Sequence, residues 1–476
     1  MTETVEPEKR DVWAVWAAPL AMLVTAAAMA VTARYATNID FEHMYRPVDA
    51  LLDGDWQGVY PADTAGTSPT GWVLLTTIPT LFFSLFVGRP EAFALANLLV
   101  LPGLLFASRF TLRALWPTLS TSKAWGLAAA AVWLPTTLAA YLNAYHPQDL
   151  AATALIILGI GLVVKRQWWW AGAVFGLAVM TRQWALLAFL PAVGFTGKNI
   201  WKVVVAAAAV GVALTAPVLL VGGNEGWLTA FSAKSAAPVG DTVLGRFRYE
   251  ATSPKGGGDQ DVVFLIARLV PLLGAVTLGA VAWLRRMTRP ELLVAFVITG
   301  LALRMLFETA NYLYYWVPFA ALFVLLVPYR RAVWAAVAVF ALAPWALDSL
   351  YPPIGTMGGG VAASISEGER LVRAVVAFVL SVGMPVACYM LIDAKKAAEL
   401  DAETPAGSPA DRVARWPAAV GVVALAAVFA PYLFGGAEPA PVQRLREITE
   451  QQQQSRDMLR EQGVDVGDGP VGRLPG

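Results

Sequence analysis

Apolar runs that are long enough to cross a membrane recur along this chain from residue 13 to residue 434. A transmembrane α-helix needs about 20 consecutive apolar residues. The composition agrees, because 57% of the residues are hydrophobic and only 14% are charged, whereas about 25% are charged in globular domains. Closed barrels also span lipid, but their short segments of alternating hydrophobicity are not seen in this sequence. The sequence therefore predicts an all-α polytopic membrane protein.

We expect about 13 transmembrane helices. They cover residues 13–33, 91–108, 124–143, 150–164, 168–181, 184–197, 200–221, 261–284, 291–307, 312–327, 331–347, 370–391 and 416–434. A further apolar run from Gly71 to Val87 contains Pro79, and its course is the difficult case.

Basic residues decide how this further run is interpreted, because short cytoplasmic loops are enriched in Lys and Arg. We place the N-terminus, with Lys9 and Arg10, in the cytoplasm. If residues 71–87 lie in the membrane interface without crossing, every basic cluster on a short loop is cytoplasmic. These clusters are Arg109/Arg113/Lys123, Lys165/Arg166, Lys198/Lys202, Arg285/Arg286/Arg289, Arg330/Arg331 and Lys395/Lys396 with Arg412/Arg415. A crossing helix would turn all of them outward, so we expect no crossing.

This topology divides the chain into regions and places it in the plasma membrane with several passes. The regions are a cytoplasmic N-terminus (1–12), a membrane domain (13–392) with an outer loop (34–90), a cytoplasmic linker (393–415), a last transmembrane helix (416–434) and a polar extracytoplasmic tail (435–476). The unusual polar residues then converge on the outer face, which predicts that the protein works at that face.

The sequence also argues against several classes of function. The net charge of +1 argues against a nucleic-acid partner. Cys388 is the single cysteine and lies in an expected span, so no disulfide is expected. Two histidines and one cysteine do not make a typical zinc site unless carboxylates help. Neither a Walker-type phosphate loop nor a Gly-x-Ser-x-Gly elbow occurs.

Carboxylates gather directly after the first apolar run, in residues 37–60 (TNIDFEHMYRPVDALLDGDWQGVY). A carboxylate just beyond a span, such as Asp40, can act as a general base if it is held near a hydroxyl. The five acids of this loop could also bind a divalent cation through oxygen ligands. A solvated acidic loop is the alternative interpretation.

With SPTGWVLL after it, this loop resembles the opening of polyprenyl-phosphate-sugar-dependent membrane glycosyltransferases of the C-type fold, above all the bacterial mannosyltransferases. The matching positions are Asp40-Phe41, Tyr45, Leu51-Leu52-Asp53-Gly54, Tyr60 and Ser68-Pro69. The step Ser68-Pro69-Thr70 departs from the family's common Tyr-Pro-Pro. The resemblance in layout covers roughly residues 10–350. It implies that the outer loop carries interfacial amphipathic helices and that Asp40 is the catalytic base. Glu42, His43 and Tyr45 become candidate substrate-binding residues.

Two short polar segments form a second group of candidates. His146 and Asp149 surround Pro147, which suits the first turn of a helix, with Asp149 near the helix N-terminus. A plain helix start is one interpretation; the resemblance implies that both residues line the site. Arg182 and Gln183 separate two short apolar segments. An arginine at membrane depth needs a partner such as a lipid phosphate, unless it snorkels to the interface.

The last candidates are Arg304, Glu308 and Asn311. Arg304 and Glu308 are spaced to pair on one helix. The aromatic residues that follow could stack on a sugar or belong to the aromatic belt at the membrane surface.

Together with the resemblance, these residues predict an inverting glycosyltransferase. It would move a sugar, expected to be mannose, from a polyprenyl-phosphate carrier to a glycolipid or polysaccharide acceptor. Asp40 would deprotonate the acceptor hydroxyl, and arginines such as Arg182 would steady the leaving phosphate without a required metal. One alternative is a transporter or flippase of lipid-linked sugars, which charges deep in the bundle would favour. Another is a non-catalytic assembly subunit.

Overall fold

The computed structural model describes residues 39–59, 70–142, 145–221, 260–308, 312–326 and 367–392. In these residues the regular structure is helical throughout and no strand occurs. Six of the helices are long and apolar enough to cross a membrane, namely Arg89–Leu115, Pro147–Val164, Gly197–Val221, Ile266–Leu284, Pro290–Phe307 and Leu371–Cys388. The prediction of a helical, multi-pass membrane protein is thereby confirmed in its coarse form. The expected spans 13–33, 331–347 and 416–434, and the linker and tail beyond residue 392, lie outside the described residues.

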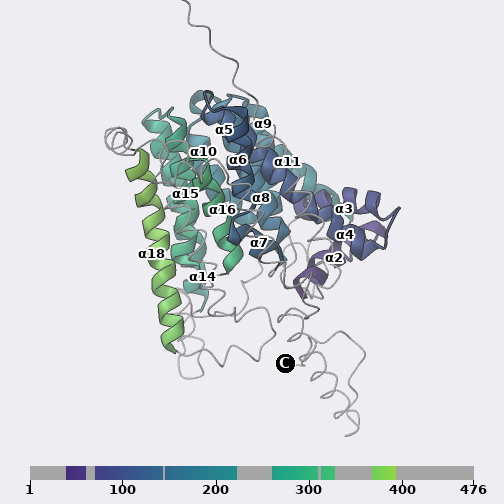
Figure 1. The fold of residues 1–476 in the computed structure, drawn as a ribbon. Coiled ribbons are helices and arrows are strands. Elements are labelled where there is room, and N and C mark those ends of the chain that lie inside the picture. The colour runs from purple at the N-terminus through teal and green to yellow at the C-terminus, as the bar shows by residue number, and fades with distance from the viewer. Residues whose placement is uncertain are drawn as a thin grey trace, which may run out of the picture.

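Figure 1 labels most of the helices, which we name in the same way. In chain order they are α2 (Ile39–Leu52), α3 (Thr70–Phe83), α4 (Arg89–Leu98), α5 (Val100–Leu115), α6 (Thr121–Val132), α7 (Pro135–Leu142), α8 (Pro147–Val164), α9 (Trp168–Thr181), the 3₁₀ helix η1 (Gln183–Ala185), α10 (Leu186–Gly194), η2 (Gly197–Asn199), α11 (Ile200–Val221), α14 (Gln260–Leu284), α15 (Pro290–Phe307), η3 (Leu313–Trp316), α16 (Val317–Val324) and α18 (Glu367–Ile392).

Four apolar segments form helices that are shorter than the six candidate spans. They are Thr70–Phe83, Trp168–Thr181, Gln183–Gly194 and Tyr314–Val324. A helix of 14 residues, such as α3, rises roughly 21 Å at about 1.5 Å per residue, against a hydrocarbon core of about 30 Å. The length of α3 is compatible with the expected non-crossing course of residues 71–87, which stays a prediction, as does the total of 13 spans.

Prolines divide two of the expected spans. Leu99 separates α4 from α5, and Pro102 has no N–H to donate to the carbonyl of Leu98. The expected span 124–143 is divided into α6 and α7, because Pro135 cannot donate to the carbonyl of Ala131. The hydroxyl of Thr137 donates to that carbonyl instead, at 3.2 Å. Both breaks therefore follow from the missing proline donor.

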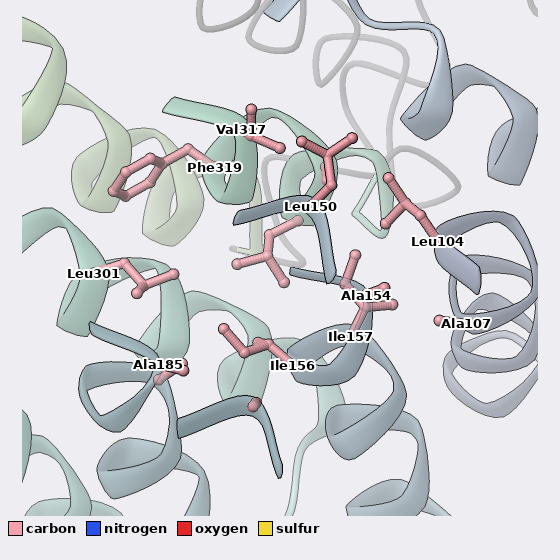
Figure 2. Packing of buried hydrophobic residues seen from close by; sticks show 14 of the residues in the cluster. Leu104, Ala107, Leu150, Ala154, Ile156, Ile157, Ala185, Leu301, Val317 and Phe319 are labelled. Carbon is pink, nitrogen blue, oxygen red and sulfur yellow. The ribbon is translucent and has the colours of Figure 1, made fainter. Parts of the chain in front are cut away.

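Helix α8 is the centre of the packed core. It is the most buried of the six candidate spans. In Figure 2 its residues Leu150, Ala154 and Ile157 lie between Leu104 of α5 and Val317 of α16. The hydroxyl of Thr111 on α5 also donates to the carbonyl of Ile157 at 2.6 Å. By contrast, α11 is exposed over most of its apolar length, which suits a helix that faces lipid tails. The N-terminus of α8 is consequently held in a rigid setting.

Helices α2, α3 and α4 lie together at one side of the bundle, with α18 at the opposite edge (Figure 1). Helix α2 ends where the sequence places Gly54, whose φ of 75° is accessible to glycine without strain. The N–H of Asp55 donates to the carbonyl of Ala50, and that of Gly54 to Leu51, which is a Schellman motif. Helix α2 therefore ends at this glycine.

An ion-pair cluster ties α2 to the start of α4. Arg89 Nη1 contacts Asp49 at 3.1 Å and Asp53 at 2.7 Å. The Tyr45 hydroxyl donates to the same Asp49 carboxylate at 2.9 Å. These charges are largely exposed, so their net contribution to stability is about 0–1 kcal/mol per pair. Their main effect is to fix the direction of α2.

Glycines allow α9 and α11 to approach closely. Gly172 and Gly176 are four residues apart on α9, the spacing of a small-residue helix contact. A Cβ at Gly176 would lie 2.6 Å from the carbonyl oxygen of Ala207, and one at Gly172 would clash with the carbonyl oxygen of Val203. The atoms nearest to an added Cβ belong to the α11 backbone, so a larger side chain at either glycine would have to displace that helix.

Gly176→Ala is expected to destabilise the protein by about 1–3 kcal/mol, because the added methyl group overpacks the α9–α11 contact. The midpoint of thermal unfolding in detergent micelles would report the loss. Gly103→Ala is the matched control, since nothing lies within 4 Å of a Cβ there and alanine favours a helix by up to about 1 kcal/mol. Equal midpoints for the two variants would contradict the close approach of α9 and α11.

Candidate functional site

The start of α8 presents His146 and Asp149 to the rest of the site. His146 is the N-cap residue, Pro147 occupies the first helical position and Asp149 lies in the first turn, as the sequence predicts. Pro147 suits that position because its missing N–H would have no helical partner anyway. The hydroxyl of Thr153 binds the Asp149 carbonyl at 2.7 Å. Backbone geometry therefore brings both predicted side chains to one helix end.

Asp149 is fully buried and is surrounded by donors. Two nitrogens of Arg182 donate hydrogen bonds to its carboxylate, Nε to Oδ1 at 3.0 Å and Nη2 to Oδ2 at 2.6 Å. The indole N–H of Trp184 donates to Oδ1 at 2.8 Å. Such a bidentate guanidinium–carboxylate pair combines charge with fixed geometry. Asp149 is more than a partner for the helix dipole, since its side chain joins α8 to the corner after α9.

Arg182 reaches Asp149 because the chain leaves the helical conformation at this residue. Helix α9 ends at Thr181, Arg182 is extended at φ −150°, and η1 begins at Gln183. Burial alone would lower the pKa of the Arg182 guanidinium, but the charge and hydrogen bonds of Asp149 outweigh it and hold that pKa above its ordinary value. Arg182 is therefore a permanent cation with a permanent partner.

His146 borders this ion pair through Nδ1. That atom lies 3.2 Å from Asp149 Oδ2, 3.1 Å from Arg182 Nη2 and 3.1 Å from Gln148 Nε2. A guanidinium can only donate a hydrogen bond, and an ionised carboxylate can only accept one. Nδ1 is thus either an unprotonated acceptor for Arg182 or a protonated donor to Asp149. The position of the imidazole proton is coupled to the pair.

Tyrosines in η3 and at its N-cap pack on the site. The ring of Tyr314 stacks on His146 with a centroid separation of 3.6 Å and an interplanar angle of 13°. Tyr312 stacks on Tyr314 at 5.3 Å, and Tyr315 meets Tyr314 edge-on at 4.8 Å. At least Tyr314 is therefore part of the candidate site rather than of an outward-facing aromatic belt.

Arg304 joins the same group from α15. Its Nε contacts Glu308 Oε2 at 3.0 Å, which confirms the pair expected from their spacing. The guanidinium lies 3.9 Å from the ring centre of Tyr315 and 5.8 Å from that of Trp184. Trp184 thus contacts Arg304 on its ring and Asp149 through its N–H. It connects the two charge pairs.

Helix α2 approaches this group from the outer-loop region. Phe41 packs on Tyr145, next to His146, with ring centroids 5.0 Å apart. Asp40 and Glu42 flank Phe41 in the first turn of α2, and the positions of their side chains are outside what the structure describes. The expected base is thereby carried on a helix whose first turn contacts the α7–α8 corner.

The other predicted residues are placed less centrally. His43 is exposed on α2, and Tyr45 points to Asp49 in the cluster with Arg89. Burial and the hydrogen bond to Asp49 raise the pKa of the Tyr45 hydroxyl, so it remains a neutral donor. Gln183 opens η1 beside Arg182, and Asn311 lies outside the described residues.

Three residues of the site lie in the two polar segments singled out from the sequence, but no role of their own was assigned to them from the sequence. Trp184 donates to Asp149, Gln148 lies within hydrogen-bond distance of His146, and the ring of Tyr145 packs on Phe41. Each one is adjacent in the chain to a predicted residue, which is the one signal that could have indicated them. Within the described ranges, no group of three or more His, Cys, Asp or Glu residues is arranged to hold a metal ion.

No protein-family model matches this chain, and no curated protein shows significant similarity to it. What the site can do therefore follows from its geometry. It combines a buried ion pair, a histidine beside that pair, a second arginine and a stack of aromatic rings.

Removing one member of the Asp149–Arg182 pair is expected to destabilise the protein strongly. Asp149→Leu leaves a buried guanidinium without its counter-charge, which costs about 3–5 kcal/mol. The double variant Asp149→Leu/Arg182→Met removes both charges and is expected to recover most of that loss. Thermal unfolding of the single and double variants in micelles measures both effects. Arg182→Met alone completes the cycle, and simple addition of the losses of the two single variants would show that the residues do not act as a pair.

Proposed function

We propose that this chain is an integral-membrane inverting glycosyltransferase. It moves a sugar, taken to be mannose, from a polyprenyl-phosphate carrier to a glycolipid or polysaccharide acceptor. The proposal includes the C-type fold with about 13 transmembrane helices and an outer loop whose helices α2 and α3 lie in the interface. It also includes a plasma-membrane location with the site on the extracytoplasmic face, as the positive-inside distribution of Lys and Arg suggests.

One observation carries the proposal. Polar residues that are far apart in the sequence converge at the start of α8, where the Phe41–Tyr145 contact also brings the first turn of α2. A helical membrane protein concentrates ionisable groups in this way at functional sites. A cluster with an imidazole, arginines and aromatic rings, next to the helix turn that carries Asp40, suits transfer of a sugar from a phosphate.

The reaction is a single displacement. Asp40 accepts the proton of the acceptor hydroxyl as that oxygen forms its bond to the anomeric carbon. The bond between the anomeric carbon and the phosphate oxygen breaks, and the carrier phosphate leaves with the electron pair. The configuration at the anomeric carbon inverts, and no sugar–enzyme bond is formed. General-base assistance of this kind contributes about 10²–10⁴-fold to the rate.

The leaving phosphate is assigned to Arg304 in preference to Arg182. Asp149 already neutralises Arg182 through two hydrogen bonds. Arg304 uses Nε for Glu308, and among the described residues its Nη1 and Nη2 make no hydrogen bond. A guanidinium edge of this kind matches two phosphate oxygens. Stacking on Tyr315 keeps the guanidinium plane in place. The earlier expectation that Arg182 binds phosphate is thus revised to a supporting role.

Asp40→Asn is expected to lower sugar transfer by about 10²–10⁴-fold, because the amide cannot accept the acceptor proton at the reacting oxygen. Purified protein in lipid would be offered radiolabelled polyprenyl-phosphate mannose with a membrane extract as acceptor source. Asp55→Asn is the matched control, as its side chain caps the N–H of Gly58 at the far end of the same segment.

Equal transfer by wild type and Asp40→Asn would reject Asp40 as the base. If neither protein transfers mannose, other polyprenyl-linked sugars are tested next. Movement of the labelled carrier across the bilayer without transfer would favour the flippase over the enzyme.

Arg304→Gln is expected to raise the KM for the polyprenyl-phosphate donor by at least about tenfold, the loss of one charge-assisted contact of about 1.5–3 kcal/mol. Arg109→Gln is the control, because Arg109 also stacks on a tryptophan, Trp125 at 4.5 Å, outside the site. Donor titration in the transfer assay measures both. An unchanged KM for Arg304→Gln would exclude this arginine as the phosphate ligand.

A further inference from the structure

Tyr145 has a backbone conformation that is unusual for a bulky residue. Its φ is +47°, in the left-handed region where a Cβ crowds the backbone and glycine is favoured. Among the described residues, Arg166 and Arg286 also have positive φ, but each follows a helix end closed by hydrogen bonds of the Schellman type. Tyr145 also follows a helix end, that of α7, where the N–H of His146 donates to the carbonyl of Ala140 at 2.9 Å. Unlike the two arginines, it directly precedes a residue of the candidate site. Strain of this kind suggests that the tyrosine side chain has a role there.

The side chain of Tyr145 is buried and has partners on two sides. It is 2% exposed, and its ring packs against Phe41 and Tyr141 at 5.0 and 5.7 Å between centroids. Its hydroxyl oxygen accepts a hydrogen bond of 2.8 Å from Asn97 Nδ2 on α4. Tyr145 is therefore bound to α2 through its ring and to α4 through its hydroxyl.

The ring contact bears on the first turn of α2. Phe41 is held between Tyr145 and Phe93 of α4, with the second ring pair 5.4 Å apart. Asp40 precedes Phe41 in that turn. The ion pairs of Arg89 act on Asp49 and Asp53, near the other end of the helix. The aromatic contacts consequently hold the first turn of α2, whereas the ion pairs of Arg89 act near the other end of the helix.

We infer that Tyr145 is a positioning residue: it holds the first turn of α2, and with it Asp40, in register with His146 and the Asp149–Arg182 pair. One residue serves both halves of the site, because its ring contacts α2 while its backbone leads into His146. The expected effect of Tyr145 on catalysis rests on the proposed function. Its expected effect on the position of α2 is independent of that function.

Two substitutions separate the ring from the hydroxyl. Tyr145→Phe keeps the ring on Phe41 but leaves the buried amide of Asn97 without its partner, so it is expected to lower the unfolding midpoint and retain most of kcat. Tyr145→Gly removes the ring and relieves the backbone strain, so it is expected to lower kcat at least about tenfold with a nearly unchanged donor KM. A merely structural tyrosine would make activity follow stability in both variants.

Hydrogen exchange of the protein in lipid nanodiscs tests the position of α2 directly. In Tyr145→Gly, exchange of residues 39–52 is expected to rise at least about tenfold, whereas residues 147–164 of α8 keep their wild-type rates. Phe41→Leu removes the same ring contact from the other side and is expected to do the same. Arg166→Gly also relieves a positive φ, at an exposed helix end, and is expected to change neither segment.

An unchanged exchange rate of α2 in Tyr145→Gly would overturn the inference. Faster exchange of α8 together with α2 in both Tyr145→Gly and Phe41→Leu would also overturn it. Retained kcat in Tyr145→Gly would also overturn it. If the wild type transfers no sugar, the proposed function fails on its own, and the exchange rates still decide whether Tyr145 positions α2.

Discussion

The buried ion pair between Asp149 and Arg182 is the interaction on which the candidate site depends. Moving two charges out of water costs several kcal/mol per ion, and only tight geometry with further hydrogen bonds offsets that cost. Here Trp184 donates to the same carboxylate, and His146 borders both charges. The carboxylate therefore joins the start of α8 to the α9–η1 corner. It also sets where the imidazole lies, and Tyr314 of η3 stacks on that ring.

Helices α2, α3 and α4 form a subassembly that packs against the rest of the helix bundle. This subassembly is attached by apolar and aromatic contacts near the first turn of α2 and by exposed ion pairs near its end. Glycines make close approach possible at its border, since a Cβ at Gly71 would lie 2.6 Å from the carbonyl oxygen of Met180. The start of α3 is thus seated beside the corner that carries Arg182. A shift of this subassembly would change the distance between its own residues and the ion pair.

The two arginines of the site, Arg182 and Arg304, have different surroundings. Arg182 binds a carboxylate through Nε and Nη2, while Arg304 binds Glu308 through Nε alone among the described residues and is stacked on aromatic rings. Sequence reasoning could not distinguish them, because both are isolated cations near the ends of apolar segments. It did anticipate that His146, Asp149, Arg182, Arg304 and Glu308 are special, and they all take part in one cluster. It assigned His43 and Tyr45 to the same site, but His43 is exposed and Tyr45 is engaged with Asp49.

Local features of the chain follow from the amino acids alone. Long apolar runs require helices in lipid, Pro147 starts α8, Gly54 ends α2, and Arg304 pairs with Glu308 four residues later. Each depends on backbone chemistry or on neighbours within one or two turns. The partner of Arg182 is of another kind, because Asp149 is 33 residues away and belongs to a different helix. The contact of Phe41 with Tyr145 likewise joins residues that are far apart in the sequence. Such pairs are selected by how the helices pack, since many apolar faces of similar composition could have met instead.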